Sequence, residues 1–210
     1  MNIREAYVES LNRDGHTEDP AQLEIIARFE DLESRLEAQR PRRGGLRTMF
    51  FRGDPIETVR GLYIWGGVGR GKTFLMDLFF ECLGIENKRR VHFHRMMHDV
   101  HDRMKTLSFV EDPLDKVAAS IAQDTRVLCF DEFFVSDIGD AMILGKLLEG
   151  LFKRGVTLVA TSNSKPDDLY KDGLQRQRFL PAIQLLNEHT EVVNMDSGTD
   201  YRLRLLQKAG

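Results

Sequence analysis

The sequence has only two cysteines in 210 residues, Cys82 and Cys129, and both lie in largely apolar surroundings. Two cysteines are too few for a disulfide framework, and neither has an adjacent histidine that would activate a thiolate. We therefore interpret Cys82 as a packing residue on a predicted helix and Cys129 as one on a predicted strand. This use of cysteine is typical of a protein from a reducing compartment.

The sequence also lacks a long hydrophobic run, an apolar leader and a large excess of charge of one sign. No apolar stretch approaches the length that a membrane-spanning helix needs. Residues 1–5 have no apolar core of a signal peptide, and the N-terminal region is too acidic for a mitochondrial presequence. The net charge of -3 gives no general attraction to nucleic acid or anionic lipid. We expect a cytoplasmic protein without a membrane span, and nucleic acid is not its expected partner.

What the sequence does contain is one stretch that fills every fixed position of the phosphate-binding pattern G-x-x-x-x-G-K-S/T. Its eight residues are Gly66, Gly67, Val68, Gly69, Arg70, Gly71, Lys72 and Thr73. The pattern at 61–65 predicts a buried strand before it, and residues 74–80 predict a helix after it. A glycine-rich turn can match by chance, but strand, motif and helix in this order are typical of a P-loop.

The P-loop predicts that the protein binds a nucleoside triphosphate. Its glycines allow successive backbone N–H groups to point at phosphate oxygens, and the following helix turns its positive end toward them. Lys72 is expected to reach the β- and γ-phosphates, and Thr73 to offer its hydroxyl to magnesium.

From residue 61 onward, strand-like segments alternate with segments long enough for helical crossovers. The predicted strands are 61–65, 90–94, 126–131, 156–161 and 191–195. This alternation predicts an α/β fold of the P-loop NTPase type, with a parallel five-stranded sheet flanked by helices. Residues 127–130 are apolar at consecutive positions, as expected for a strand buried on both faces.

Residues 1–39 predict an N-terminal helical extension of two helices. The second begins with Asp19 as N-cap and Pro20 at the first helical position. Apolar residues at helical spacing then mark one buried face: Ile25, Phe29, Leu32 and Leu36. We expect the pair to pack on the core, with binding of a partner protein as the alternative.

A basic hinge and lead-in, residues 40–60, connects this extension to the ATPase core, residues 61–210. Four arginines fall within residues 40–47, on either side of a Gly-Gly pair. Such a run is usually a solvated linker, and contact with nucleic-acid phosphates is the alternative.

The third predicted strand ends in Asp131 and Glu132, an acidic pair suited to the second half of a nucleotide site. An aspartate at the end of a neighbouring strand can hold the water shell of magnesium, and an adjacent glutamate can polarise the attacking water. An Asp-Glu pair also occurs in ordinary turns. After a four-residue apolar run, however, it favours hydrolysis of ATP over nucleotide-gated binding alone.

Two further positions are candidates for catalysis. Asn163 follows the fourth predicted strand and is expected to hydrogen-bond the attacking water or the γ-phosphate, although a plain Ser-Asn-Ser turn is the alternative. Arg178, or failing that Arg176, stands before a predicted helix where an arginine finger for a neighbouring subunit is expected. Either arginine can instead be an ordinary surface residue.

Four histidines lie within ten residues: His92, His94, His98 and His101. Their spacing allows a zinc site, but no cysteine or paired acid completes it, so we interpret them as capping or packing residues. Asp137 precedes an apolar helical stripe and is interpreted as an N-cap rather than as a catalytic acid.

With these motifs in place, nearly the whole chain resembles the ZapE family of AAA+ ATPases, whose mitochondrial branch is called AFG-one-like. The P-loop alone is widely shared, whereas His-Phe-His-Arg at 92–95 and Asp-Glu-Phe-Phe-Val-Ser-Asp at 131–137 are far more selective. Further matches are Thr-Ser-Asn-Ser-Lys-Pro at 161–166, Arg-Phe-Leu-Pro at 178–181 and Asp-Tyr-Arg-Leu-Arg at 200–204.

The resemblance implies an ATPase that remodels protein partners, in bacterial cell division at the FtsZ ring or in mitochondrial protein quality control. It also implies a homo-oligomeric ring. Family members continue beyond the motif at 200–204, so we expect the C-terminal lid to be absent from residues 61–210 and this chain to be monomeric.

Two alternative functions come from other classes of protein. One is a nucleotide-gated DNA-binding module of the helicase-loader type, because helicase loaders share this core layout. The only sequence feature that supports this alternative is the group of arginines at 40–47. The other is a small-molecule kinase, which the Asp-Glu pair followed by a polar residue on the next strand disfavours.

Overall fold

The computed structural model describes residues 1–15, 17–39, 58–107 and 109–196. Most of the predicted hinge, including the arginines of 40–47, lies outside the described residues. The motif at 200–204 also lies outside them.

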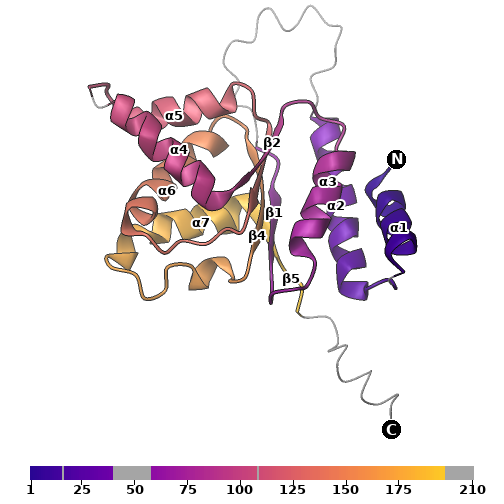
Figure 1. Ribbon diagram of the computed structural model, residues 1–210. Helices are drawn as coiled ribbons and strands as arrows, with labels where there is room; N and C mark the ends of the chain where they lie inside the picture. The colour runs from indigo at the N-terminus through magenta and orange to yellow at the C-terminus, as the bar shows by residue number, and fades with distance from the viewer. Residues whose placement is uncertain (16, 40–57, 108, 197–210) are drawn as a thin grey trace, which may run out of the picture.

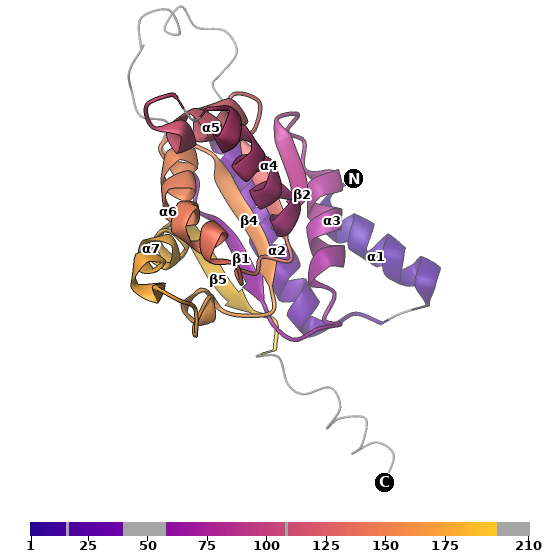
Figure 2. The same cartoon turned by 60° about the vertical axis from the view of Figure 1, so that its left-hand side comes forward.

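Five parallel strands form the sheet, in the order β2-β3-β4-β1-β5. They are β1 (Gly61–Trp65), β2 (Lys88–His92), β3 (Val127–Asp131), β4 (Thr157–Ser162) and β5 (Thr190–Asn194). Figure 2 shows them side by side, with β2 at one edge and β5 at the other. The predicted α/β fold with a five-stranded parallel sheet is confirmed.

The second strand begins and ends two residues earlier than predicted. Residues 90–94 were expected, but the strand covers Lys88–His92 and a helix begins at Phe93. The reason is that Phe93 belongs to a helical stripe rather than to the strand pattern. It is buried together with Met96, Met97 and Val100, at the i, i+3, i+4 and i+7 spacing of one helix face.

Helices cover both faces of the sheet (Figure 1). On one side lie α1 (Ile3–Asp14), α2 (Pro20–Ala38) and α3 (Lys72–Cys82). On the other lie α4 (Phe93–Thr106), α5 (Pro113–Ala122), α6 (Ile138–Phe152) and α7 (Leu180–His189). Two short 3-10 helices, η2 (Pro166–Asp168) and η3 (Arg176–Arg178), lie between β4 and α7.

The sheet has a separate hydrophobic core on each face because successive side chains of a strand point in opposite directions. In β1, Leu62 and Ile64 pack with α1, α2 and α3, whereas Tyr63 packs with α4 to α7. The same alternation in β3 places Cys129 in the first core and Phe130 in the second. Burial on both faces explains the continuous apolar pattern of β3.

The N-terminal helical pair packs on the core, as the first interpretation of residues 1–39 predicted. Asp19 accepts a hydrogen bond from the backbone of Ala21 as N-cap of α2. The predicted stripe of α2 is fully buried, and Phe29 stacks on Phe79 of α3 with ring centroids 4.3 Å apart. Burial of these apolar side chains is what holds α2 against α3 and β1.

The cysteines pack as predicted. Cys129 is completely buried in β3, and this burial raises the pKa of its thiol to about 12, so the thiol stays protonated and unreactive. Burial also raises the pKa of Cys82 on α3. In the part of the chain that the structure describes, no helix combines the length and apolar character needed to cross a membrane.

Candidate nucleotide-binding site

A cavity of about 690 Å³ opens at the carboxyl ends of β1, β3 and β4. Because β4 lies between β1 and β3, the P-loop after β1 and the acidic pair after β3 face one another across the tip of β4. Ligands of open α/β sheets bind at this end of the strands. The lining residues are Val68, Gly69, Arg70, Gly71, Lys72, Thr73, Phe74, His94, Glu132, Phe133, Phe134, Thr161, Ser162 and Asn163.

The P-loop takes its shape from glycines in conformations that other residues avoid. Gly69 and Gly71 have φ of 80° and 84°, and Gly71 is the N-cap of α3. Gly71 is also closely approached, because a Cβ there would lie 2.7 Å from Nε2 of Gln22. The backbone therefore curls over the N-terminus of α3, where its N–H groups can meet phosphate oxygens.

Lys72 is folded into the loop and is only 9% exposed. Its Nζ donates to the carbonyl oxygens of Gly66 at 2.8 Å and of Gly67 at 2.7 Å. Burial lowers the pKa of the ammonium group, while the nearby charges of Asp196 and Asp131 oppose that shift. The ammonium is thus held in the P-loop by neutral carbonyl acceptors. The charged oxygens of a triphosphate would replace them with stronger acceptors.

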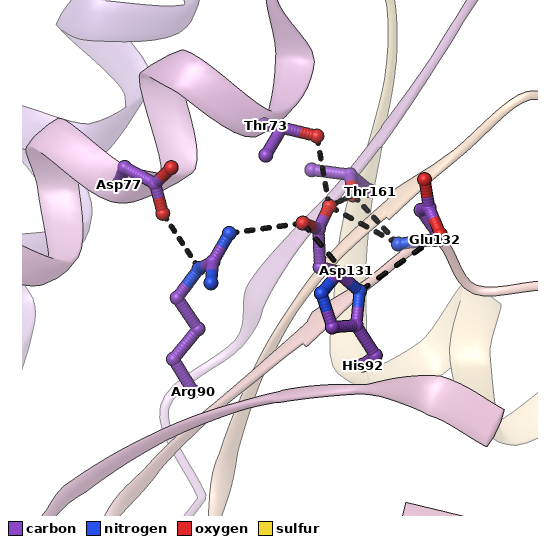
Figure 3. A network of polar contacts seen from close by, with 7 residues as sticks. All are labelled: Thr73, Asp77, Arg90, His92, Asp131, Glu132 and Thr161. Carbon is purple, nitrogen blue, oxygen red and sulfur yellow. Dashed lines mark hydrogen bonds and ion pairs between the residues drawn. The ribbon is translucent and has the colours of Figure 1, made fainter. Parts of the chain in front are cut away.

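Thr73, which lines the cavity, contacts Asp131 (Figure 3). The Thr73 hydroxyl donates to Oδ1 of Asp131 at 3.0 Å, and the Thr161 hydroxyl donates to the same oxygen at 2.6 Å. Asp131 is only 1% exposed. These hydrogen bonds hold the Asp131 carboxylate next to the Thr73 hydroxyl at the N-terminus of α3.

The donor set at this point fits magnesium. It consists of one hydroxyl and one buried carboxylate, both hard oxygen ligands. The described residues hold no group of three or more histidines, cysteines or acids arranged as a metal cage. Few protein ligands are typical of magnesium, which keeps several waters and is bound largely through substrate phosphates.

Glu132 projects from a strained turn directly after β3. Its φ of 54° is unusual for a residue other than glycine. Two hydrogen bonds hold the turn, from the Glu132 N–H to Oδ1 of Asp131 and to Oγ1 of Thr161, both at 3.1 Å. The side chain is 75% exposed and lines the cavity, with Nδ1 of His92 3.8 Å from its Oε2. Strain at such a position is typical of functional sites.

Asn163 lies on the cavity wall, one residue beyond the end of β4. The turn is held by Ser162, whose hydroxyl donates to the carbonyl of Phe133 at 2.7 Å and accepts from the N–H of Ser164. The structure therefore brings Asn163 and Glu132 to the same cavity as the P-loop.

The two candidate finger arginines lie elsewhere. Arg176 and Arg178 are on η3 and do not line the cavity of their own chain. Arg176 donates to the carbonyl of Asp167 at 2.6 Å, whereas Arg178 is exposed and donates to Oε1 of Gln175 at 3.2 Å. Arg178 is thus the arginine whose side chain is available to another molecule.

The histidines do not gather at one point. His94 lines the nucleotide cavity, His98 lies 3.2 Å from Asp102, and His101 lies 2.8 Å from Asp140. Asp137 caps α6 by accepting hydrogen bonds from the N–H groups of Gly139 and Asp140, so its interpretation as an N-cap is confirmed.

Sequence reasoning missed residues that brace the outside of the P-loop. Gln22 of α2 donates to the carbonyl of Arg70 at 3.1 Å and accepts from the Tyr7 hydroxyl at 2.9 Å. On the other side, Asp196 accepts from the N–H of Gly67 at 2.7 Å. Local patterns carry no signal for these contacts, because the partners are 48 and 129 residues apart in sequence.

Sequence reasoning also missed a cation beside Asp131. Arg90, from the middle of β2, donates from Nη2 to Oδ2 of Asp131 at 2.9 Å. Its Nε lies 2.6 Å from Oδ1 of Asp77 on α3. Within β2 the sequence gives no reason to single out Arg90, because Lys88, Arg89 and His92 are basic as well.

Comparison with known proteins shows the family to which the chain is similar. The family model described as "AFG1-like ATPase" matches residues 1–210. The chain is 51% identical over 212 residues to the cell division protein ZapE of Escherichia coli K12, covering 97% of this chain and 56% of that protein. It is 49% identical over 162 residues to lactation elevated protein 1 homolog B of Danio rerio, covering 72% and 32% of the two chains. The chain thus spans about half the length of ZapE and about a third of the length of the Danio rerio relative.

Solved structures share the fold at much lower identity. The crystal structure of DnaI is similar with a TM-score of 0.57 and 15% identity, covering 87% of this chain and 88% of that one. AMPPCP-bound DnaA from Aquifex aeolicus is similar with a TM-score of 0.58 and 10% identity, covering 93% and 53%. These similarities establish a P-loop NTPase fold.

Proposed function

The chain belongs to the AFG1-like ATPase family, and from this premise we propose that it hydrolyses ATP with magnesium to act on a protein partner. One observation carries the catalytic part of the proposal. Thr73 and Asp131 are joined by a hydrogen bond, and Glu132 follows them on the wall of the cavity that holds the P-loop. A nucleotide-binding module without hydrolysis needs no acid at the position of Glu132.

Each residue has one step in the proposed reaction. Lys72 and the backbone N–H groups bind the β- and γ-phosphates, while Thr73 and Asp131 would hold magnesium, directly and through water. Magnesium neutralises charge on the phosphate oxygens when bound. Glu132 polarises the attacking water, and Asn163 orients that water or the γ-phosphate. Asp131 is buried and held by its hydrogen bonds, whereas the exposed side chain of Glu132 is free to meet the water.

For the partner, we propose a protein of cell division, because the Escherichia coli relative is a cell division protein. The tubulin-like division protein FtsZ is the first candidate. ATPases act on partners in their ATP state, so a variant that binds ATP without cleaving it should retain the partner longest.

A pull-down tests this part of the proposal. Glu132→Gln protein with ATP and magnesium should capture FtsZ, whereas Lys72→Ala protein, which lacks the cation of the phosphate cradle, should not. Equal capture by both variants, or capture by neither, would contradict a partner that depends on the ATP state.

Nucleotide-gated DNA binding remains the alternative, and its support is weaker. The resemblance to DnaI and DnaA is a resemblance of fold, and the arginines of 40–47 lie outside the described residues. Single-stranded DNA that bound with a steep salt dependence and accelerated ATP hydrolysis would favour this alternative.

Replacing Arg178 by alanine should leave ATP binding intact and reduce turnover in the assembled protein. Arg178 does not line its own cavity and is exposed, so we propose that it reaches the γ-phosphate of a neighbouring subunit in a homo-oligomeric ring. An arginine finger is worth about 10³–10⁵ in rate. Turnover is measured by phosphate release at saturating ATP.

A mixing experiment distinguishes action on a neighbour from action within one chain. Arg178→Ala subunits keep the pocket and Lys72→Ala subunits keep the finger, so a mixture should recover part of the activity that each lacks alone. Arg176→Ala tests the second candidate in the same way. Because the guanidinium of Arg176 is already bonded to the carbonyl of Asp167, we expect this variant to keep more of its turnover than Arg178→Ala does. No recovery at any ratio, with mixed assembly shown, would exclude the finger.

A further inference from the structure

Arg90 places a positive charge against the carboxylate that would hold magnesium (Figure 3). It stands on β2 opposite Cys129 in the register with β3, two residues before Asp131. Its Nη2 donates to Oδ2 of Asp131 at 2.9 Å, and its side chain is 26% exposed. The guanidinium is therefore partly buried and in direct contact with the carboxylate of Asp131.

Both oxygens of Asp131 are engaged by the protein. Oδ1 accepts from Thr73, from Thr161 and from the N–H of Glu132, while Oδ2 accepts from Arg90. A carboxylate with this many donors cannot rotate, and it is best suited to contact magnesium through a bound water. Among the described residues, Arg90 is the only arginine or lysine that forms an ion pair with Asp131, and Nδ1 of His92 lies 3.9 Å from the same Oδ2.

Asp77 fixes the other end of the guanidinium. It lies on α3 four residues after Thr73, on the same face of the helix, and its Oδ1 is 2.6 Å from Nε of Arg90. Arg90 is thus clamped between Asp77 and Asp131, and a chain of charges connects α3, β2 and β3 around Thr73. The contact with Asp77 is an ion pair, whereas the contact with Asp131 is a hydrogen bond from Nη2, which depends on the fixed N–H directions of the planar guanidinium.

We propose that Arg90, braced by Asp77, is a positioning residue that sets both the orientation of Asp131 and the affinity of the site for magnesium. The guanidinium attracts the same carboxylate as the metal, so it lowers magnesium affinity while it holds Asp131 in the geometry for hydrolysis. This inference rests on the proposed magnesium and ATP site. Neither the nucleotide motifs nor the comparisons assign a residue to this task.

The charges predict opposite effects of two substitutions. Arg90→Gln removes a cation near the metal, so the magnesium concentration for half-maximal nucleotide binding should fall about tenfold. Asp77→Asn removes an anion and releases Arg90 toward Asp131, so the same concentration should rise about threefold. Both variants should lower kcat by about tenfold. Arg90→Gln loses the hydrogen bond to Oδ2 of Asp131, and Asp77→Asn removes the anion that keeps the guanidinium, and with it Asp131, in one position.

The experiment titrates magnesium into protein with a fluorescent ADP analogue, and repeats the binding in EDTA. Arg90→Lys keeps the charge without the fork, so it should keep the wild-type magnesium dependence within about twofold and lose kcat. Arg89→Gln is the matched control, because Arg89 is adjacent on β2 but lies 3.9 Å from Asp99 on α4. It should change neither quantity.

A merely structural role of Arg90 would lower the melting temperature without shifting magnesium dependence in opposite directions for the two variants. Shifts of the same sign in Arg90→Gln and Asp77→Asn, or no shift in either, would overturn the proposal. Should Arg90→Gln fail to fold, Asp77→Asn and Arg90→Lys still decide it. Wild-type protein whose nucleotide binding ignored magnesium would instead contradict the proposed function itself.

Discussion

Lys72→Ala protein is expected to lose ATP binding by about 100-fold or more while keeping its fold. The lysine ammonium is buried in the loop beside the N-terminus of α3, where it would make charge-assisted hydrogen bonds to two phosphates. Each such bond is worth about 1.5–3 kcal/mol, so the loss of two corresponds to at least about 10² in affinity. Isothermal titration calorimetry with ATP and magnesium measures the effect.

Lys153→Ala is a suitable control for this experiment. Lys153 forms an ion pair with Glu149, but it is exposed at the end of α6 and is not among the described residues that line the cavity. It should bind ATP as the wild type does. Unchanged affinity in Lys72→Ala, at a melting temperature equal to that of the wild type, would show that the loop does not bind the triphosphate.

Glu132→Gln protein should bind ATP normally and cleave it about 10²–10⁴-fold more slowly. The substitution preserves size and leaves the backbone N–H of residue 132 bonded to Asp131 and Thr161, so the pocket should keep its shape. Only the carboxylate that we propose as the acceptor of the water proton is removed. Phosphate release measures turnover, and calorimetry confirms that binding persists.

Glu149→Gln removes an equivalent carboxylate from an exposed position on α6 and should have wild-type turnover. Hydrolysis by Glu132→Gln at the wild-type rate would move the general base to another residue. Loss of binding together with turnover would show instead that Glu132 supports the pocket.

The parts of the site that could be predicted from the sequence are those whose residues are neighbours in the chain. The spacing of Gly66 to Thr73 dictates a loop that leads into a helix, whatever the rest of the fold. The apolar run before Asp131 places the acidic pair at the end of a buried strand. Parallel strands end at one edge of a sheet, so both motifs had to lie near one another.

Contacts between distant segments could not be predicted. Arg90 is one of several basic residues in its strand, and only the pairing of β2 with β3 brings it to Asp131. Gln22 reaches the P-loop because the buried face of α2 packs on α3, which fixes the rotation of the helix. The predicted boundary of β2 was wrong for a related reason. Phe93 fits the apolar pattern of a strand as well as that of the helix, and only the packing of α4 shows that it belongs to the helix.

The roles of Asn163, Arg176 and Arg178 remain predictions. A polar residue at a strand end and an arginine before a helix have ordinary structural uses, and position alone does not separate these from catalysis. The structure places Asn163 at the cavity and the arginines away from it, which is compatible with the proposed steps.

The most direct test of the central claim is a single-turnover assay in the presence of magnesium, with the protein in excess over ATP. It requires only that bound ATP is cleaved once, and so does not depend on product release. Because Arg178 is proposed to act on a neighbouring subunit, the protein is assayed at a concentration at which the subunits assemble. The wild type should convert the bound ATP to ADP and phosphate, whereas Glu132→Gln should hold it intact and conversion should cease in EDTA. ATP that stayed uncleaved on wild-type protein, with binding demonstrated, would contradict the assignment of this site as an ATPase.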